Sequence, residues 1–318
     1  MKNNNFFLSW SIIFVLLTSF IFALLIGEGL YGFGADYYVI YYENNLNFGS
    51  FVNRLGWIIS TFTLNGVHLG VHISTFFLSL SFGMLLRLFF HIKKLDSLLI
   101  FLTIFIIGIH TWPIIMSTSN AMRQGLGMSM IFFALCAYID RQNLLFFIFI
   151  FISIFIHKTC IFFASIFLLS IFVLNLMSKS KNFSNKLFLF FGIIIFLFTS
   201  LIIHSYEDAT IASKIIEKDY RYHMLLISIF YVLIAHSKNN FLKDYFNIFL
   251  YLFIFGSFSL FFLQLNWEYE RLMMMMLIPI ILSIGSIFKK KSAYIYYSVV
   301  FSSLLILTIS NGMYQSFQ

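Results

Sequence analysis

Charged residues, cysteine and proline are all scarce in this sequence of 318 residues. Charged residues make up 10% of the chain and hydrophobic ones 61%, so it cannot surround one soluble core with a polar shell. The two cysteines, Cys136 and Cys160, fall in separate apolar spans and near opposite faces of the membrane, which argues against a disulfide bond. The eight histidines are scattered and no acidic pair has ligand spacing, so we expect no metal and no other cofactor.

Long apolar runs fill the chain instead. The mean hydropathy is +0.94, and 45 residues are phenylalanine. Segments of about 20 apolar residues recur, which is the length that crosses a bilayer as a helix. The sequence therefore predicts an all-α polytopic integral membrane protein, one transmembrane domain over 1–318, with about eleven spans near 6–27, 67–90, 97–115, 121–139, 144–157, 159–177, 187–204, 223–236, 245–266, 272–288 and 294–312.

One apolar run, 144–177, has an unusual length. Its 34 residues are too many for one ordinary span and few for two. We predict a tight turn at His157 and Lys158, which interrupt the run; a single long tilted helix would also fit the length.

The basic residues predict the orientation. The net charge of +8 needs no nucleic acid to explain it, because the bilayer itself accounts for it. With a cytoplasmic N-terminus, the cytoplasmic side receives 13 basic and three acidic residues, and the far side seven basic and nine acidic. The positive-inside rule selects this topology. The polar loops at about 28–66, 205–222 and 266–271 then face outward.

Four of the outward basic residues stand where helices running from outside to inside should begin: Arg123, Lys158, Arg221 and Arg271. A helix N-terminus is already partly positive, so a cation there is mildly unfavourable unless an anion binds nearby. The alternative is an interfacial side chain that reaches water or pairs with an acidic neighbour. We favour that alternative for Arg221 and Lys158, and anion binding for Arg123 and Arg271.

Three stretches resemble a known family. Residues 120–163, "NAMRQGLGMSMIFFALCAYIDRQNLLFFIFIFISIFIHKTCIFF", resemble the signature region of the EpsG/Wzy group of bacterial polysaccharide polymerases, with matching positions Asn120, Arg123, Gln124 and His157. Upstream, "GADYYVIYYENN" resembles the family's Gly-x-Asp-Tyr and spaced tyrosines, carried by Gly34, Asp36, Tyr37, Tyr41 and Tyr42. Near the end, "WEYERLMMMMLIPIIL" resembles its late Glu-Arg, here Glu270 and Arg271. Lys158 departs from the pattern, since the family usually has a small or hydroxyl residue there.

The resemblance implies a glycosyltransferase with a GT-C-like membrane fold. It would polymerise undecaprenyl-diphosphate-linked oligosaccharides, as donor and acceptor, into O-antigen, capsule or exopolysaccharide. The site would face outward from the bacterial cytoplasmic (inner) membrane, and a polysaccharide co-polymerase that regulates chain length would be a partner. No metal would take part.

The arginines suit the leaving group of that reaction. A guanidinium binds phosphate oxygens in a bidentate fork, and preset donors stabilise charge that grows on a leaving diphosphate. We therefore assign Arg123 and Arg271 as diphosphate clamps, with Arg54 as a third candidate. His157 could be a general base toward the acceptor hydroxyl, a hydrogen-bond donor to phosphate, or a structural histidine.

Other candidate residues could have either a structural or a functional role. Asp36 could cap a short helix at 37–45 or serve as the carboxylate base. Tyr37, Tyr41 and Tyr42 could stack on sugars or belong to an interfacial aromatic belt. The remaining substrate-binding candidates are Asn120, Gln124, Lys158, Arg221 and Glu270.

Other functional classes compete with the polymerase. A flippase for lipid-linked saccharides would share the substrate, but it should show repeats, interrupted helices and charges in mid-membrane. An O-antigen ligase or a membrane acyltransferase of sugars would be enzyme alternatives. A purely structural role does not explain the outward cations.

Overall fold

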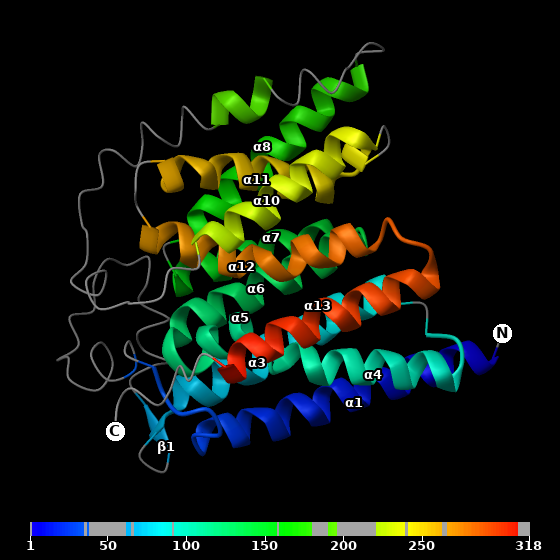
Figure 1. The fold of residues 1–318 in the computed structure, drawn as a ribbon, viewed down its shortest axis with the longest axis vertical. Helices are drawn as coiled ribbons and strands as arrows, with labels where there is room; N and C mark the ends of the chain where they lie inside the picture. Colours follow the sequence, from blue (N-terminus) through cyan, green and yellow to red (C-terminus); the bar gives the residue numbers. More distant parts are fainter. Residues whose placement is uncertain are drawn as a thin grey trace. The chain divides into compact units, whose positions relative to one another are not determined.

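The computed structural model describes the chain except for residues 1, 35–36, 38–61, 65–66, 91, 158, 180–189, 196–220, 239–240, 263–265 and 311–318. The regular secondary structure of the described part is helical apart from one antiparallel pair of two-residue strands (Figure 1). The elements are α1 (Lys2–Gly27), β1 (Thr63–Leu64), β2 (Val67–His68), α3 (Leu69–Phe89), α4 (Leu95–Ile109), α5 (Trp112–Ile115), the π-helix η2 (Met116–Asn120), α6 (Met122–Ile139), α7 (Asn143–Ile156), α8 (Cys160–Lys179), α10 (Arg221–Ser237), the 3-10 helix η4 (Phe241–Lys243), α11 (Tyr245–Phe262), α12 (Asn266–Gly285) and α13 (Lys290–Ser310).

The chain divides into two compact units. The first unit consists of Met1–Cys160 and Gly285–Gln318, so α13 joins the helices α1 to α7. The second unit consists of Ile161–Ile284 and contains α8, α10, α11 and α12. Each unit is described below by itself.

Several helices meet the requirements of a membrane span. In the described residues five helices are long and apolar enough, namely Phe6–Gly27, Leu69–Phe89, Met122–Ile139, Tyr245–Phe262 and Lys290–Ile309. A sixth span results if Leu95–Ile109 and Trp112–Ser119 are one bent span. Three more apolar helices, Asn143–Ile156, Cys160–Leu176 and Arg221–Ser237, are shorter. The all-α polytopic class is confirmed, while the count of eleven spans stays a prediction.

Small residues let the helices of the first unit pack closely. α3 packs against α1 and α6, and α6 packs against α7. A Cβ on Gly83 of α3 would lie 2.5 Å from Val15 of α1 and 2.8 Å from Phe105 of α4, so the three helices meet there. α13 lies along α4, where the buried Phe301 contacts Phe82 edge to face with centroids 5.7 Å apart (Figure 1).

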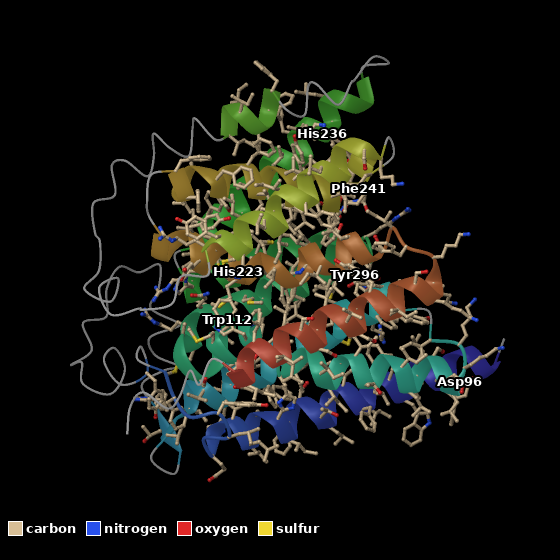
Figure 2. All side chains as sticks on the ribbon, in the orientation of Figure 1. Asp96, Trp112, His223, His236, Phe241 and Tyr296 are labelled. Atoms are coloured by element: carbon tan, nitrogen blue, oxygen red, sulfur yellow. The ribbon has the colours of Figure 1, made fainter. Side chains whose placement is uncertain are left out.

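The helix ends of the first unit form two sets, and Figure 2 shows Asp96 at one end and Trp112 at the other. We call the first the basic end; it carries Lys2, Arg87, Lys93, Lys94, Arg141, Lys289, Lys290 and Lys291. We call the second the Arg123 end. It contains the C-terminus of α1, the start of α3, the segment 110–121, the start of α6, and His157 and Thr159.

The span expected at 97–115 is interrupted. α4 ends at Ile109, and the second residue of α5 is Pro113. Proline has no backbone N–H, and its ring would clash with the carbonyl of Ile109, four residues earlier, so one straight helix cannot continue through it. The axis bends by 54° at this point. The prediction of one uninterrupted span was wrong in this detail.

The apolar run 144–177 breaks where the sequence predicted a turn. α7 ends at Ile156 and α8 begins at Cys160. The His157 backbone is extended, and the Cys160 N–H donates to the His157 carbonyl at 3.0 Å, the hydrogen bond of a four-residue turn. The alternative of one long helix is excluded.

α6 ends without the usual glycine. The Gln142 N–H donates to the Ala137 carbonyl at 2.7 Å, and the Arg141 N–H to the Tyr138 carbonyl at 2.9 Å. These two bonds form a Schellman motif, in which the C′ residue adopts a left-handed conformation. Arg141 occupies that position with φ 60°.

In the second unit, a buried polar network joins α10, η4, α11 and α12. Asn247 donates to the Phe241 carbonyl at 2.9 Å, its carbonyl accepts from Tyr231 at 3.2 Å, and its side-chain oxygen accepts from Ser283. Figure 2 shows His223 and His236 at opposite ends of α10. α12 begins at Asn266, earlier than the predicted 272, so residues 266–271 are helical rather than a loop.

Candidate functional site

The segment before Arg123 is buried. Ser117, Thr118 and Ser119 of η2 are fully inaccessible. The Thr118 and Ser119 hydroxyls each donate to the Ile115 carbonyl at 3.0 Å, so the hydroxyls satisfy backbone acceptors within α5 and η2. The Ala121 N–H closes the π turn onto the Met116 carbonyl at 3.0 Å.

Gly125 brings α6 against this segment. A Cβ at position 125 would lie 1.7 Å from the Ser117 carbonyl oxygen and 2.7 Å from its carbon. Both are backbone atoms, so only glycine allows the first turn of α6 to lie here. The contact holds Arg123, the second residue of α6, directly beside η2.

Two of the motifs that carried the resemblance meet at this point. The Gly34 N–H donates to the Ser119 carbonyl at 3.3 Å, which joins the chain after α1 to the residue before Asn120. The Tyr37 N–H donates to the Gly34 carbonyl at 3.0 Å, and its hydroxyl accepts from the His68 N–H at 3.3 Å. The Tyr37 ring is buried and stacks on Phe33 at 4.4 Å.

His157 lies against the same helix, one turn beyond Arg123. A Cβ on Gly127 would approach its Cβ to 3.2 Å and Cys160 Sγ to 3.0 Å. The His157 side chain is 8% exposed, and its N–H donates to the Ser153 carbonyl at 3.0 Å. Its Nδ1 lies 2.6 Å from Thr159 Oγ1. Arg123 is half-buried and Gln124 is buried, and both stand in the turn of α6 before Gly127.

Two further histidines of the Arg123 end form hydrogen bonds, one to α1 and one to the segment that follows α1. His72 Nδ1 lies 3.2 Å from the Ala23 carbonyl oxygen, which can only accept, so this nitrogen carries the proton. His110 Nδ1 lies 2.6 Å from the Tyr31 hydroxyl. Burial raises the pKa of the Tyr31 phenol, so it stays protonated at neutral pH.

The late Glu-Arg pair lies in the second unit. Glu270 and Arg271 are half-buried in the second turn of α12, not at its first residue as predicted. Arg221 begins α10 and lies 5.7 Å from the centroid of its neighbour Tyr222. The Tyr222 ring contacts Phe261, and Phe261 contacts Tyr269, so the starts of α10 and α12 lie at one end of this unit.

Several predicted site residues fall outside the described part of the chain: Asp36, Tyr41, Tyr42, Arg54 and Lys158. Asn120 is described by its backbone in η2. Among the described residues, no three His, Cys, Asp or Glu side chains are grouped so that they could hold a metal ion. Both cysteines are free thiols.

The comparison with protein families decides the affiliation. The family model of the EpsG family matches residues 12–317, nearly the whole chain. The chain belongs to the EpsG family. It is thus a membrane protein of the polysaccharide-polymerase type, in line with the resemblance of its motifs. No curated protein and no solved structure matches it.

Sequence reasoning missed three residues of this EpsG protein's Arg123 end. Gly125 stands one residue after Gln124, and a glycine in the first turn of a helix signals close backbone approach. Ser117 gave no signal, because its contribution is a carbonyl oxygen. Thr159 carries a weak signal, since a hydroxyl two residues after a histidine can reach its ring.

Proposed function

We propose that the chain is a glycosyltransferase that polymerises undecaprenyl-diphosphate-linked oligosaccharide repeat units into O-antigen or a related surface polysaccharide. The reaction takes place on the outer face of the bacterial cytoplasmic membrane. The observation that carries this proposal is the meeting of two family motifs at the Arg123 end: Gly34 bonds to Ser119, just before Asn120 and Arg123, and His157, from the same signature region as Arg123, packs on α6 at Gly127.

The charges of the first unit support the outward orientation. Among its described residues, the basic end has eight Lys or Arg residues and two acidic ones, Asp96 and Asp140. The described Asp, Glu, Lys and Arg residues of the Arg123 end are Arg123 and Glu28. The positive-inside rule puts the basic end in the cytoplasm. The Arg123 end then faces the compartment where lipid-linked repeat units are polymerised.

The reaction needs a cation at the leaving group. The bond between the anomeric carbon and a diphosphate oxygen breaks, and a hydroxyl oxygen of the incoming unit bonds to that carbon. Negative charge grows on the diphosphate, and a fixed guanidinium stabilises it more in the transition state than in the ground state. Arg123 provides this contact, and the partly positive start of α6 adds to it. Arg271 is the second arginine that binds the diphosphate. The proposal also includes eleven transmembrane spans in a GT-C-like arrangement.

One observation favours a flippase as second candidate. Discontinuous helices line the substrate path of many transporters, and the α4–α5 bend is such a break. However, α4 has 15 residues before the break, or about 22 Å of a hydrocarbon core of about 30 Å. The break therefore lies toward the Arg123 end of the unit, where a surface-facing enzyme site belongs, and not at mid-membrane.

Deleting the gene separates the two functions. Loss of a polymerase should leave a single repeat unit attached to its surface acceptor, whereas loss of a flippase should leave no surface saccharide. Purified protein in bilayers should in addition convert lipid-linked repeat units into a ladder on a gel. Export without polymerisation by the purified protein would overturn the proposal.

A further inference from the structure

Two groups of Thr159, its hydroxyl and its backbone N–H, contact the same ring nitrogen of His157, Nδ1. Thr159 Oγ1 lies 2.6 Å from His157 Nδ1. The backbone N–H of Thr159 also points at Nδ1, with a nitrogen-to-nitrogen distance of 3.4 Å. A backbone amide can only donate, so its direction reveals which form of the ring this site accommodates.

A neutral imidazole has one in-plane position on each nitrogen, taken by a proton or by a lone pair. A proton on Nδ1 would point at the Thr159 amide hydrogen, and the two like partial charges would repel. A lone pair on Nδ1 accepts from the amide and from the hydroxyl together. In the neutral ring the proton must then sit on Nε2.

We infer that Thr159 is a positioning residue that fixes His157 as the Nε2–H tautomer, so that the ring donates a hydrogen bond to the lipid diphosphate and is not the general base. This role deepens the proposed function and rests on it for the identity of the ligand.

The surrounding backbone keeps the ring in this geometry. His157 donates to Ser153 through its N–H and accepts from Cys160 through its carbonyl, both at 3.0 Å. Gly127 lies against its Cβ, and the side chain is 8% exposed. Because Thr159 is two residues away in a hydrogen-bonded turn, its amide cannot leave Nδ1 without opening the turn.

The transfer reaction then needs no proton to be taken up by His157. The anomeric carbon exchanges its bond to the diphosphate oxygen for a bond to the acceptor hydroxyl oxygen. The hydroxyl proton passes to an oxygen of the released diphosphate, whose basicity rises as that bond breaks. His157 keeps its Nε2 proton and donates it to another diphosphate oxygen throughout.

Nitrogen-15 NMR of histidine-labelled protein in bilayers tests the tautomer directly. The signal that disappears in His157→Gln belongs to His157, and we expect a protonated Nε2 and an unprotonated Nδ1 at neutral pH. His72 is the internal control, because its contact with the Ala23 carbonyl requires the opposite tautomer. A protonated Nδ1 on neutral His157 overturns the inference, whatever the protein's activity.

Substitutions at position 159 test the cause. Thr159→Val removes the hydroxyl at nearly constant volume and keeps the backbone amide, so the Nε2–H form should persist while the Nδ1 resonance shifts because one donor is lost; Thr159→Ser should restore the original spectrum. Adding undecaprenyl diphosphate to the wild-type protein should shift the Nε2 resonance. An Nδ1 resonance that does not move in Thr159→Val removes the Thr159 hydroxyl from the positioning role.

Activity distinguishes donor from base. A glutamine amide reaches the place of Nε2 and an asparagine amide that of Nδ1, so His157→Gln should retain far more polymerisation than His157→Asn. We expect about 10- to 100-fold between them, the value of one charge-assisted hydrogen bond. Equal abolition by both, with native folding, indicates a base and overturns the inference. Wild-type protein that binds the diphosphate but never polymerises would refute the proposed function and leave the tautomer intact.

Discussion

The carbonyl oxygen of Ser117 lies 1.7 Å from the point where residue 125 would carry a β-carbon. Gly125→Ala must therefore separate the start of α6 from η2, and overpacking of this kind costs about 1–3 kcal/mol. We expect a lower unfolding temperature in detergent and loss of polymerisation.

Gly127→Ala is the matched control for that substitution. Its Cβ would meet Cys160 Sγ at 3.0 Å and His157 Cβ at 3.2 Å. Side chains give way more easily than backbone, so the loss of stability should be smaller. Equal unfolding temperatures for the two variants would contradict the close approach at Gly125.

A second prediction concerns the guanidinium of Arg123. Arg123→Lys keeps the charge but loses the planar fork that binds two phosphate oxygens. Polymerisation by purified protein should fall about 10- to 100-fold, with normal membrane insertion. Arg141→Lys, at the basic end, should change little. Wild-type polymer yield with lysine at position 123 would remove this residue from the diphosphate contact.

A third prediction tests the hypothesis from the sequence that Arg123 and Arg271 act on one ligand. Residues that act together lose energy non-additively. Arg271→Ala alone should then reduce the rate nearly as much as the double change with Arg123→Ala. The measurement is a double-mutant cycle on initial rates, with substrate binding determined separately. Strictly additive effects would show that the two arginines act independently.

A fourth prediction concerns orientation. Reporter fusions after Lys94 and after Lys290 should read cytoplasmic, and a fusion after Tyr31 should read external. These positions lie at the two ends of the first unit, so they test its charge asymmetry directly. A cytoplasmic signal after Tyr31 would place the Arg123 end on the wrong side for polymerisation.

A fifth prediction uses the left-handed Arg141. Glycine adopts φ near 60° without the steric cost of about 1–2 kcal/mol that other residues pay there, so Arg141→Gly should raise the free energy of unfolding, although the greater freedom of glycine in the unfolded chain offsets part of the gain. Arg141→Ala loses the same charge and keeps the cost, so it serves as control. Should the glycine variant be no more stable than the alanine variant, the Schellman geometry would be wrong.

The sequence predicted the features that depend on hydropathy and on residues that interrupt apolar segments. The break in the run 144–177 followed from a His-Lys pair in an apolar stretch, and α7 does end at Ile156. The start of α12 was missed, because Glu268 and Glu270 suggested a loop although acidic residues suit the first turns of a helix. The bend before Pro113 had its signal in the proline itself.

Features that depend on contacts between distant residues left no trace in one sequence. The bond from Gly34 to Ser119 joins backbone groups and carries no side-chain preference. The left-handed turn after α6 uses an arginine where glycine is the usual signal. The family motifs indicated which residues belong together, and the helix packing shows how Gly125 and Gly127 bring part of them into contact.

The place of α13 has a consequence for biosynthesis. The ribosome completes α1 to α7 and then the whole of the second unit before α13 emerges, yet Phe82 of α3 and Gly108 of α4 lie against Phe301 of that late helix. The nascent chain therefore waits in the membrane with one side of α4 in contact with lipid or with the insertion machinery. A ribosome that stops before residue 290 releases a protein that has inserted Arg123 and His157 but lacks the helix against which α4 packs. Quality-control proteases would recognise that truncated chain as incompletely assembled.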